Sequence, residues 1–179
     1  MVRNAFFIIA LFAGVVVMTG ASEAADPENT LYLDLKDGRV IIEMRPDLAP
    51  NHVAQIKKLV REKFYDGLKF HRVIEGFMAQ GGDNGAGGSG NKLVAEFSKE
   101  LHVRGVASMA RTSDPDSADS QFFIMLDAAP SLDGKYTVWG KVTKGMELVD
   151  NIKKGPSHRN GVVDDPDSIV RMQIAADVR

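Results

Sequence analysis

Short segments of strand character, separated by turn residues, recur along this chain and constrain its fold more than any other feature. They cover residues 31–35, 40–44, 68–74, 103–111, 121–126, 136–142 and 169–175. In the first and last of them apolar and polar residues alternate, which is typical of strands with one buried face. The turn pair Asp37-Gly38 separates the first two segments and predicts a hairpin. Many short strands with few helices favour a closed antiparallel barrel or a sandwich, because closure leaves no unpaired strand edge.

Two other stretches have the spacing of amphipathic helices. Apolar residues recur at helical intervals in residues 51–63, with charged residues on the opposite face. Similar spacing is found in residues 144–154. We therefore expect two helices that cover the open ends of the barrel.

Length and composition are those of one ordinary globular domain. The chain has 179 residues, 44% of them hydrophobic and 26% charged, which is enough to bury a core. Its net charge is −2 and it has no run of Lys and Arg, so it lacks the basic surface expected of a nucleic-acid-binding protein. It has no cysteine, which excludes disulfides, thiolate catalysis and cysteine-based zinc sites.

The N-terminus has the pattern of a secretory signal peptide. Arg3 precedes an uncharged apolar run over residues 5–18, and Ser22 and Ala24 fit an A-x-A-like cleavage site. The run is short for a bilayer span, which needs about 20 apolar residues.

This pattern predicts a signal peptide over residues 1–24, followed by a single mature domain over residues 25–179. Cleavage after Ala21 instead of Ala24 also fits, and an uncleaved membrane anchor is the alternative. We expect an exported protein with no stable membrane association after signal removal. It would lie in the periplasm of a Gram-negative bacterium and would otherwise be secreted.

Two loops contain patterns of known binding motifs without the context that those motifs require. Residues 85–90 match G-x-G-x-x-G, but no strand leads directly into them and no amphipathic helix follows, which argues against a dinucleotide site. Residues 112–119 contain three Asp but lack the twelve-residue ligand pattern of a calcium loop. We expect both segments to be loops.

Residues 70–83 carry the strongest functional signal. Arg72 lies there among apolar residues, and Phe77, Met78 and Gln80 follow at short range. A guanidinium is always charged and has five donors in a planar fork, so placing it beside apolar groups costs desolvation. A side-chain carbonyl such as that of Gln80 would orient the fork without cancelling its charge. The alternative is a solvated arginine on a strand edge, with Phe and Met in the core.

The rest of the sequence offers no nucleophile, metal site or acid–base pair. No two of the four histidines are spaced as metal ligands on one element, and no Gly-x-Ser-x-Gly motif occurs. His71, alone in a strand, is more typical of a structural residue than of a catalyst. An enzyme with this sequence would therefore catalyse a reaction that needs none of these groups and no cofactor.

Rotation about a peptide bond is such a reaction. Its barrier is about 18–20 kcal/mol because the twisted amide loses resonance, and X–Pro bonds interconvert slowly between two isomers of similar energy. A catalyst need only bind the twisted form more tightly than the planar forms. A charged donor near the amide nitrogen and an apolar pocket for the proline ring would do so. Arg72 supplies the donor, and Phe77, Met78 and Phe123 supply the apolar groups.

Several motifs of the chain resemble those of the cyclophilins, which are peptidyl-prolyl cis-trans isomerases. The resemblance extends from about residue 31 to residue 176 and follows the family's order. It is carried by Phe70-His71-Arg72, Gly76-Phe77-Met78, Gln80-Gly81-Gly82-Asp83, Ser120-Gln121-Phe122-Phe123-Ile124, Leu132-Asp133-Gly134-Lys135 and Val138-Trp139-Gly140-Lys141-Val142. It implies a mainly β fold, a closed eight-stranded antiparallel barrel capped by two α-helices. It also implies an isomerase that acts on X–Pro bonds while exported proteins fold.

The same resemblance implies roles for the site residues. Arg72 would be the catalytic arginine, held by Gln80. Phe77, the third residue assigned to catalysis, would line the proline pocket. The substrate-binding residues would be Met78, Ala110, Arg111, Gln121, Phe123, Leu132 and Tyr136. The apolar members of this set would line the proline pocket, and Ala110, Arg111 and Gln121 would flank the groove for the residues before proline. No metal would take part.

Three positions differ from the best-known eukaryotic members of the family. Arg111 stands where Asn is usual, which is similar to the bacterial branch. Tyr136 replaces a pocket His but keeps an aromatic wall and a hydroxyl, so we expect activity to survive. Ser131 replaces a Trp that helps to bind cyclosporin, so the resemblance implies weak binding of that drug.

Two other functions fit the pattern. The first is a non-catalytic module that binds proline-containing segments as a chaperone or assembly factor, using the same groove without needing the charge of Arg72. The second is a barrel for a small apolar ligand, which gives no reason for Arg72 and Gln80. We expect proline-containing polypeptides as partners, no nucleic acid, and a monomer.

Overall fold

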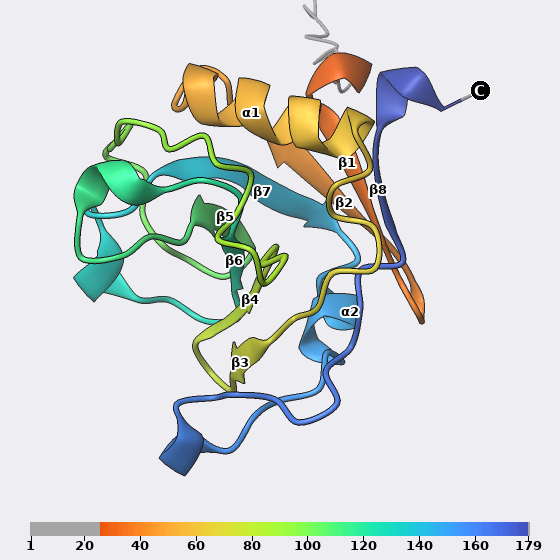
Figure 1. Cartoon of the computed structure of the whole chain (residues 1–179), viewed down its shortest axis with the longest axis vertical. Coiled ribbons are helices and arrows are strands. Elements are labelled where there is room, and N and C mark those ends of the chain that lie inside the picture. The colour runs from red at the N-terminus through yellow and green to blue at the C-terminus, as the bar shows by residue number, and fades with distance from the viewer. Residues whose placement is uncertain (1–25, 179) are drawn as a thin grey trace, which may run out of the picture.

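The computed structural model describes residues 26–178, which form one antiparallel sheet with two helices packed on it (Figure 1). The strands are β1 (Thr30–Leu35), β2 (Gly38–Met44), β3 (Arg72–Ile74), β4 (Met78–Gly81), β5 (Val106–Met109), β6 (Phe122–Met125), β7 (Val138–Lys144) and β8 (Arg171–Ile174), and the helices are α1 (Pro50–Arg61) and α2 (Met146–Asp150). Helix α1 packs against β8 across one end of the sheet, and α2 lies against β2. The predicted signal peptide, residues 1–24, lies outside the described residues.

The sheet is an open half-barrel, so the predicted closed barrel is wrong. Its strand order is β3-β4-β6-β5-β7-β2-β1-β8, which leaves β3 and β8 as edges. Within the described residues, isolated bridges join the chain around these edges, Lys69 with Ser168 and Arg72 with Val162. A continuous ladder does not form because β3 has only three residues and the chain before β8 is irregular. Pro166 in that chain has no backbone N–H to add to a ladder.

The predicted hairpin at the start of the domain is confirmed. Strands β1 and β2 pair antiparallel up to Leu35, which lies opposite Gly38 at the turn. Alternate residues of β1 face the core, so Leu31 and Leu33 are fully buried whereas Tyr32 between them is partly exposed. The period-two pattern therefore describes this pair of strands correctly.

Strand β4 was not predicted from the local pattern. Its residues, Met78–Gly81, are few and lead into glycines, a composition that indicates a turn more than a strand. The strand forms because β3 pairs with one of its edges and β6 with the other. Strand β3 is a neighbour in sequence, but β6 lies far along the chain, where a local pattern does not connect it with β4.

Both helices exist, with different lengths from those predicted. Helix α1 begins at Pro50 and ends at Arg61, within two residues of the expected bounds. Helix α2 has only five residues, fewer than the predicted 144–154. The difference arises because β7 extends to Lys144 and Gly145 then takes a left-handed conformation, with φ of 84°, before the helix begins. No helix among residues 26–178 is long and apolar enough to cross a membrane.

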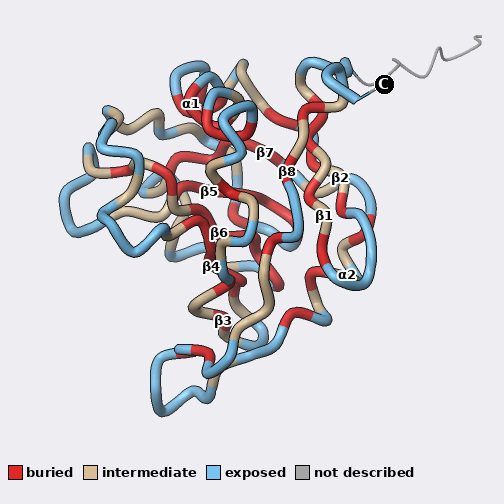
Figure 2. Tube along the Cα trace, turned by 45° about the vertical axis from the view of Figure 1, so that its right-hand side comes forward, coloured by how far each residue is buried: buried red, intermediate tan, exposed pale blue. Residues whose placement is uncertain are grey.

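Aromatic residues form the centre of the core inside the half-barrel. The ring of Trp139 is fully buried and meets Phe122 edge to face at 5.8 Å between ring centroids. Tyr65 contacts the other side of Phe122 at 5.7 Å. Figure 2 shows that burial follows the strands, whereas the connecting loops are mostly exposed. The core thus supports the sheet from within.

The N-terminus of α1 is capped by a residue far away in sequence. Ala49 precedes the helix and has no side-chain acceptor. Instead, Glu96 accepts the backbone N–H groups of Asn51 and His52, each at 3.1 Å, and its Oε2 lies 2.6 Å from Nδ1 of His52. A carboxylate here satisfies free helix N–H groups and interacts favourably with the helix dipole. Glu96 therefore anchors the irregular 91–105 segment to α1.

Candidate active site

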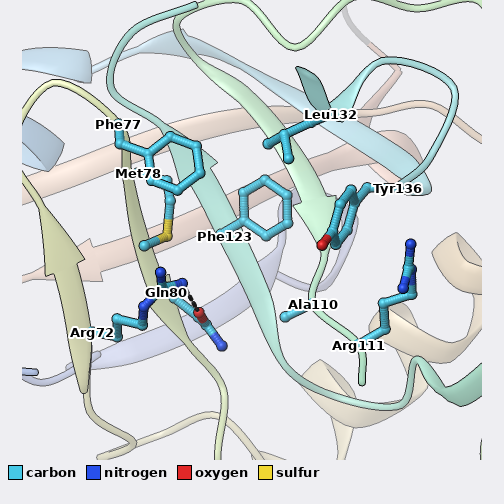
Figure 3. Close-up of a pocket in the computed structure, with 9 residues that line it drawn as sticks. All are labelled: Arg72, Phe77, Met78, Gln80, Ala110, Arg111, Phe123, Leu132 and Tyr136. Carbon is cyan, nitrogen blue, oxygen red and sulfur yellow. Dashed lines mark hydrogen bonds between the residues drawn. The ribbon is translucent and has the colours of Figure 1, made fainter. Parts of the chain in front are cut away.

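Arg72 and Gln80 lie directly opposite each other on β3 and β4. Side chains of such a pair project from the same face of the sheet. Nη1 of Arg72 donates to Oε1 of Gln80 at 3.1 Å, as drawn in Figure 3. Nε2 of Gln80 in turn donates to Oε1 of Gln121 at 3.0 Å. The glutamine is thereby fixed with its oxygen toward the guanidinium.

Asn160 supplies two further acceptors to Arg72. Nε of Arg72 donates to the backbone oxygen of Asn160 and Nη2 to its Oδ1, both at 3.0 Å. Among residues 26–178 no carboxylate forms a salt bridge with Arg72. Its three hydrogen-bond acceptors are neutral, so its positive charge is not cancelled. One hydrogen on Nη1 and one on Nη2 are left for a bound molecule.

An apolar pocket opens beside this arginine (Figure 3). Phe77, Met78, Phe123, Leu132 and Tyr136 form its apolar wall, and Figure 3 shows Met78 and Phe123 nearest to Arg72 and Gln80. The side chains of Met78 and Phe123 are largely buried because β4 and β6 pair at the centre of this half of the sheet. The ring of Tyr136 meets that of Phe123 edge to face at 5.7 Å. The pocket therefore has a rigid aromatic floor and a charged rim.

Arg111 closes the opposite side of the pocket. Its guanidinium lies 4.5 Å from the ring centroid of Tyr136, a cation–π contact. The same group donates to the backbone oxygens of Lys135 at 2.9 Å and Thr112 at 2.8 Å. Arg111 thus folds back over Tyr136 and extends the wall of the pocket.

A second hollow continues from the first and makes the site a groove. The two hollows share Gln80, Ala110 and Arg111. Gln121 lines only the second hollow, where Lys92 and Asp119 are also found. Nine of the ten predicted site residues therefore surround the first hollow, and Gln121 joins them through its hydrogen bond to Gln80. His71, next to Arg72 in sequence, is not part of either lining.

A Ser–His–Asp constellation lies beneath the pocket floor, and the sequence analysis did not single it out. Oγ of Ser108 is 3.0 Å from Nε2 of His102, and Nδ1 of His102 is 3.1 Å from Oδ1 of Asp133. Ser108 and His102 are buried, so a substrate carbonyl has no access to the hydroxyl. His102 stacks on Phe123 at 6.2 Å. The constellation supports the floor of the pocket and is not a hydrolytic site.

Burial lowers the pKa of His102, and the hydrogen bond that its ring donates to Asp133 opposes that shift without reversing it. The ring is therefore neutral at neutral pH, with one nitrogen facing Ser108 and the other facing Asp133. Within residues 26–178 no group of three His, Asp or Glu side chains is arranged to hold a metal ion.

Comparison with known protein families identifies the family that this chain matches. The pattern of the family described as "Cyclophilin type peptidyl-prolyl cis-trans isomerase/CLD" matches residues 30–174. The chain belongs to this family. Its reaction is thus the cis-trans isomerisation of X–Pro peptide bonds, and the isomerase predicted from the residues and the resemblance is confirmed.

Relatives of this cyclophilin carry the same activity in their names. A probable peptidyl-prolyl cis-trans isomerase of Brucella suis is 53% identical over 193 aligned positions, which cover 99% of this chain and 98% of that protein. Peptidyl-prolyl cis-trans isomerase B of Bacillus subtilis is 46% identical and covers 70% of this chain and 92% of its own length.

Solved cyclophilin structures match the fold. The crystal structure of a cyclophilin from Hirschia baltica superposes with a TM-score of 0.78 at 32% identity, covering 87% of this chain and 77% of that one. A cyclophilin-type isomerase of Cryptosporidium parvum, crystallised in the presence of the dipeptide Ala-Pro, gives 0.71 at 28% identity, with 81% and 98% covered. The open eight-stranded sheet with two helices is therefore the fold of this family.

Proposed function

We propose that this cyclophilin accelerates X–Pro isomerisation by stabilising the twisted amide with Arg72 above an apolar proline pocket. The observation that carries this proposal is the arrangement of Arg72. Its guanidinium is held by neutral acceptors only, beside the wall formed by Phe77, Met78 and Phe123. A charge that is fixed but not cancelled acts more strongly on a nearby reacting group than one already paired with a carboxylate.

The mechanism follows from the change in the amide during rotation. Twisting removes the resonance of the C–N bond and returns a lone pair to the proline nitrogen. A hydrogen of Nη1 or Nη2 that Gln80 and Asn160 leave free would then donate toward that nitrogen or the adjacent carbonyl. The planar isomers lack this lone pair, so the interaction favours the twisted state selectively. The aromatic wall would hold the proline ring while the preceding carbonyl rotates.

The substrates would be proline-containing polypeptides that lie extended along the groove. Ala110, Arg111 and Gln121 flank the part of the groove that would receive the residues before proline. The presence of Ala-Pro with the Cryptosporidium relative supports this substrate class. The apolar run and small residues at the N-terminus support a signal peptide over residues 1–24, so the clients would be exported proteins, in the periplasm or outside the cell.

The decisive experiment compares catalysis with binding in Arg72→Ala. The cis-to-trans rate of a short X–Pro peptide would be measured for wild type and variant, together with the dissociation constant of the same peptide. We expect kcat/KM to fall by about 100- to 1,000-fold, with a change of about threefold or less in peptide affinity. Arg45→Ala is the matched control, because Arg45 pairs with Asp47 outside the groove.

The outcomes separate the two functions that share the groove. A variant that retains the wild-type rate would exclude Arg72 as the catalytic group. A folded wild type that binds the peptide without accelerating its isomerisation would make the protein a chaperone or assembly factor. Intact-mass measurement after expression in an export-competent host tests the signal peptide, which is excluded if the purified chain still begins at Met1.

A further inference from the structure

Asn160 is the second residue that holds Arg72, and no sequence pattern pointed to it. It stands in the connection between α2 and β8, 88 positions after Arg72. Its backbone oxygen accepts from Nε and its Oδ1 from Nη2, while Gln80 accepts from Nη1. All three nitrogens of the guanidinium are therefore engaged, two of them by this single residue.

The backbone of Asn160 makes this double contact possible. Its φ of 53° lies in the left-handed region, which Asn tolerates better than most residues with a Cβ. It follows the short helical turn Ser157–Arg159, and its N–H donates to the backbone oxygen of Ser157. In this conformation the backbone oxygen and Oδ1 of Asn160 both face Arg72.

The segment around Asn160 is held against β3 by close backbone contacts. The N–H of Val73 donates to the oxygen of Gly161 at 2.8 Å, and the N–H of Gly155 donates to the oxygen of Val73 at 2.9 Å. A Cβ on Gly161 would lie 2.3 Å from Cγ1 of Ile74, so only glycine permits this approach. The position of Asn160 is therefore set by the strand that carries Arg72.

The open edge of the sheet explains why this segment is available. Pairing of β3 directly with β8 would occupy the edge of β3 with a regular strand. Instead, residues 155–163 run along that edge as an irregular loop, seen below β3 in Figure 1. An irregular loop can place a left-handed residue beside Arg72, which a regular strand cannot.

We propose that Asn160 is a positioning residue for catalysis, which fixes the plane of the Arg72 guanidinium while leaving its charge uncancelled. This proposal rests on the function proposed for Arg72. Gln80 accepts from Nη1, and Asn160 accepts from Nε and Nη2. Rotation of the fork would break at least one of these hydrogen bonds, so they hold its two free hydrogens in one direction. Orientation before the reaction lowers the barrier because the donor need not reorganise as the amide twists.

Two substitutions separate a positioning role from a merely structural one. Asn160→Gly keeps the left-handed backbone and its carbonyl and removes Oδ1. Asn160→Asp keeps the shape and both acceptors and adds a negative charge beside Arg72, so it would hold the loop at least as firmly. Asp165→Gly is the matched control, because Asp165 is an exposed left-handed residue, with φ of 51°, in the same connection.

Steady-state isomerisation of a short X–Pro peptide and the thermal unfolding midpoint would be measured for each variant. We expect Asn160→Gly to lower kcat by about three- to tenfold with KM changed by about twofold or less, as for loss of one partly exposed charge-assisted hydrogen bond. We expect Asn160→Asp to lower kcat by about tenfold or more with an unchanged or higher unfolding midpoint, because the carboxylate cancels the charge of Arg72. Asp165→Gly should retain wild-type kinetics.

A double substitution tests whether Asn160 affects kcat by orienting the guanidinium of Arg72. In an Arg72→Lys background, Asn160→Gly should change kcat by about twofold or less, because an ammonium has no planar fork to orient. Wild-type kcat in both Asn160→Gly and Asn160→Asp would overturn the proposal, as would a faster Asn160→Asp. If Arg72→Ala is inactive while both Asn160 variants have the wild-type kcat, the positioning role of Asn160 is excluded and the function proposed for Arg72 stands. If Arg72→Ala is fully active, the function proposed for Arg72 is excluded, and the positioning role of Asn160 is excluded with it.

Discussion

The imidazole of His102 is stacked beneath the ring of Phe123, with 6.2 Å between the ring centroids and 23° between the ring planes. This contact joins the buried Ser108–His102–Asp133 constellation to the floor of the proline pocket. We therefore expect the protonation state of His102 to affect both the stability of the domain and the shape of the pocket.

Acidification below neutral pH should destabilise the fold through His102. Burial lowers its pKa in the folded protein below the ordinary value of about 6.5, so the unfolded chain binds more protons between the two values. The contribution of His102 to stability is complete above about pH 6.5 and is lost as the pH falls toward the lower folded pKa. Denaturant unfolding between about pH 7 and pH 5 measures this slope.

The substitution His102→Gln should remove that slope. It should also lower the free energy of unfolding at neutral pH by about 1–3 kcal/mol, because a buried polar network loses a partner. His158→Gln, at an exposed position, is the control and should leave the slope in place. An unchanged slope in His102→Gln would assign the pH dependence to other groups.

Replacement of Glu96 by Ala should destabilise α1. The substitution removes the acceptor for two backbone N–H groups and leaves Nδ1 of the buried His52 without its partner, at a cost of about 2–3 kcal/mol. Equilibrium unfolding in urea measures the loss. Glu62→Ala, on an exposed residue at the other end of α1, should change stability by about 0.5 kcal/mol or less. Equal stabilities of the two variants would contradict the capping role.

The Glu96 cap should also make stability depend on pH, but for a different reason. Hydrogen bonds lower the pKa of Glu96, whereas burial lowers that of His102. Burial raises the pKa of Glu96, but hydrogen bonds from His52 and Asn51 outweigh it, and the net shift is downward from about 4.5. The stabilisation is thus present above about pH 4.5 and is lost as the pH falls through the lower folded pKa. Glu96→Gln should flatten unfolding stability in that acidic range.

Alanine at Gly161 should disturb the fold and the site together. Gly161 has φ of 74°, and a Cβ there would lie 2.3 Å from Ile74, so the loop must move away from β3. We expect a loss of about 2 kcal/mol or more and a reduced isomerisation rate. Gly85→Ala is the control, since Gly85 has a similar φ of 70° with open space around it, and should cost only about 1 kcal/mol with normal activity. Similar losses in both variants would show that backbone strain alone is responsible.

The weak cyclosporin binding implied by the family resemblance stays a prediction. Ser131 is exposed beside Leu132 at the rim of the pocket and offers no ring to an apolar ligand. Ser131→Trp would add an aromatic surface and an N–H donor, and we expect inhibition by cyclosporin to strengthen by about tenfold or more. Ser131→Ala is the control and should not change it. Tight inhibition of the wild type would show that this position does not decide binding.

Much of the site was predictable because its residues lie close together in sequence. Arg72 and Gln80 face each other across a short turn, so one local segment indicated the hydrogen bond between them. The first hairpin was predictable for the same reason. Strand β4 was missed although it lies in that segment, because its four residues acquire strand geometry from pairing with β6.

Asn160, Glu96 and His102 were missed for a different reason. Each acts on a residue that only folding brings near, across 88 positions for Asn160 and Arg72 and 44 for Glu96 and His52. An exposed Asn in a loop or a Glu in an irregular segment has no local pattern that distinguishes it from solvated residues. Neither Asn160 nor Glu96 could therefore be assigned a role before its partner was known.

Local sequence patterns were enough to predict most of the strands, the first hairpin turn, the family and most of the pocket, because alternation, turn chemistry and short motifs are local properties of the chain. Tertiary structure alone decided that the sheet stays open and that a loop with a left-handed Asn160 covers its β3 edge. This is because unpaired backbone groups and a buried or half-buried charge must find hydrogen-bond partners. Which distant residue supplies those acceptors depends on how the whole sheet curves and which edges it leaves unpaired.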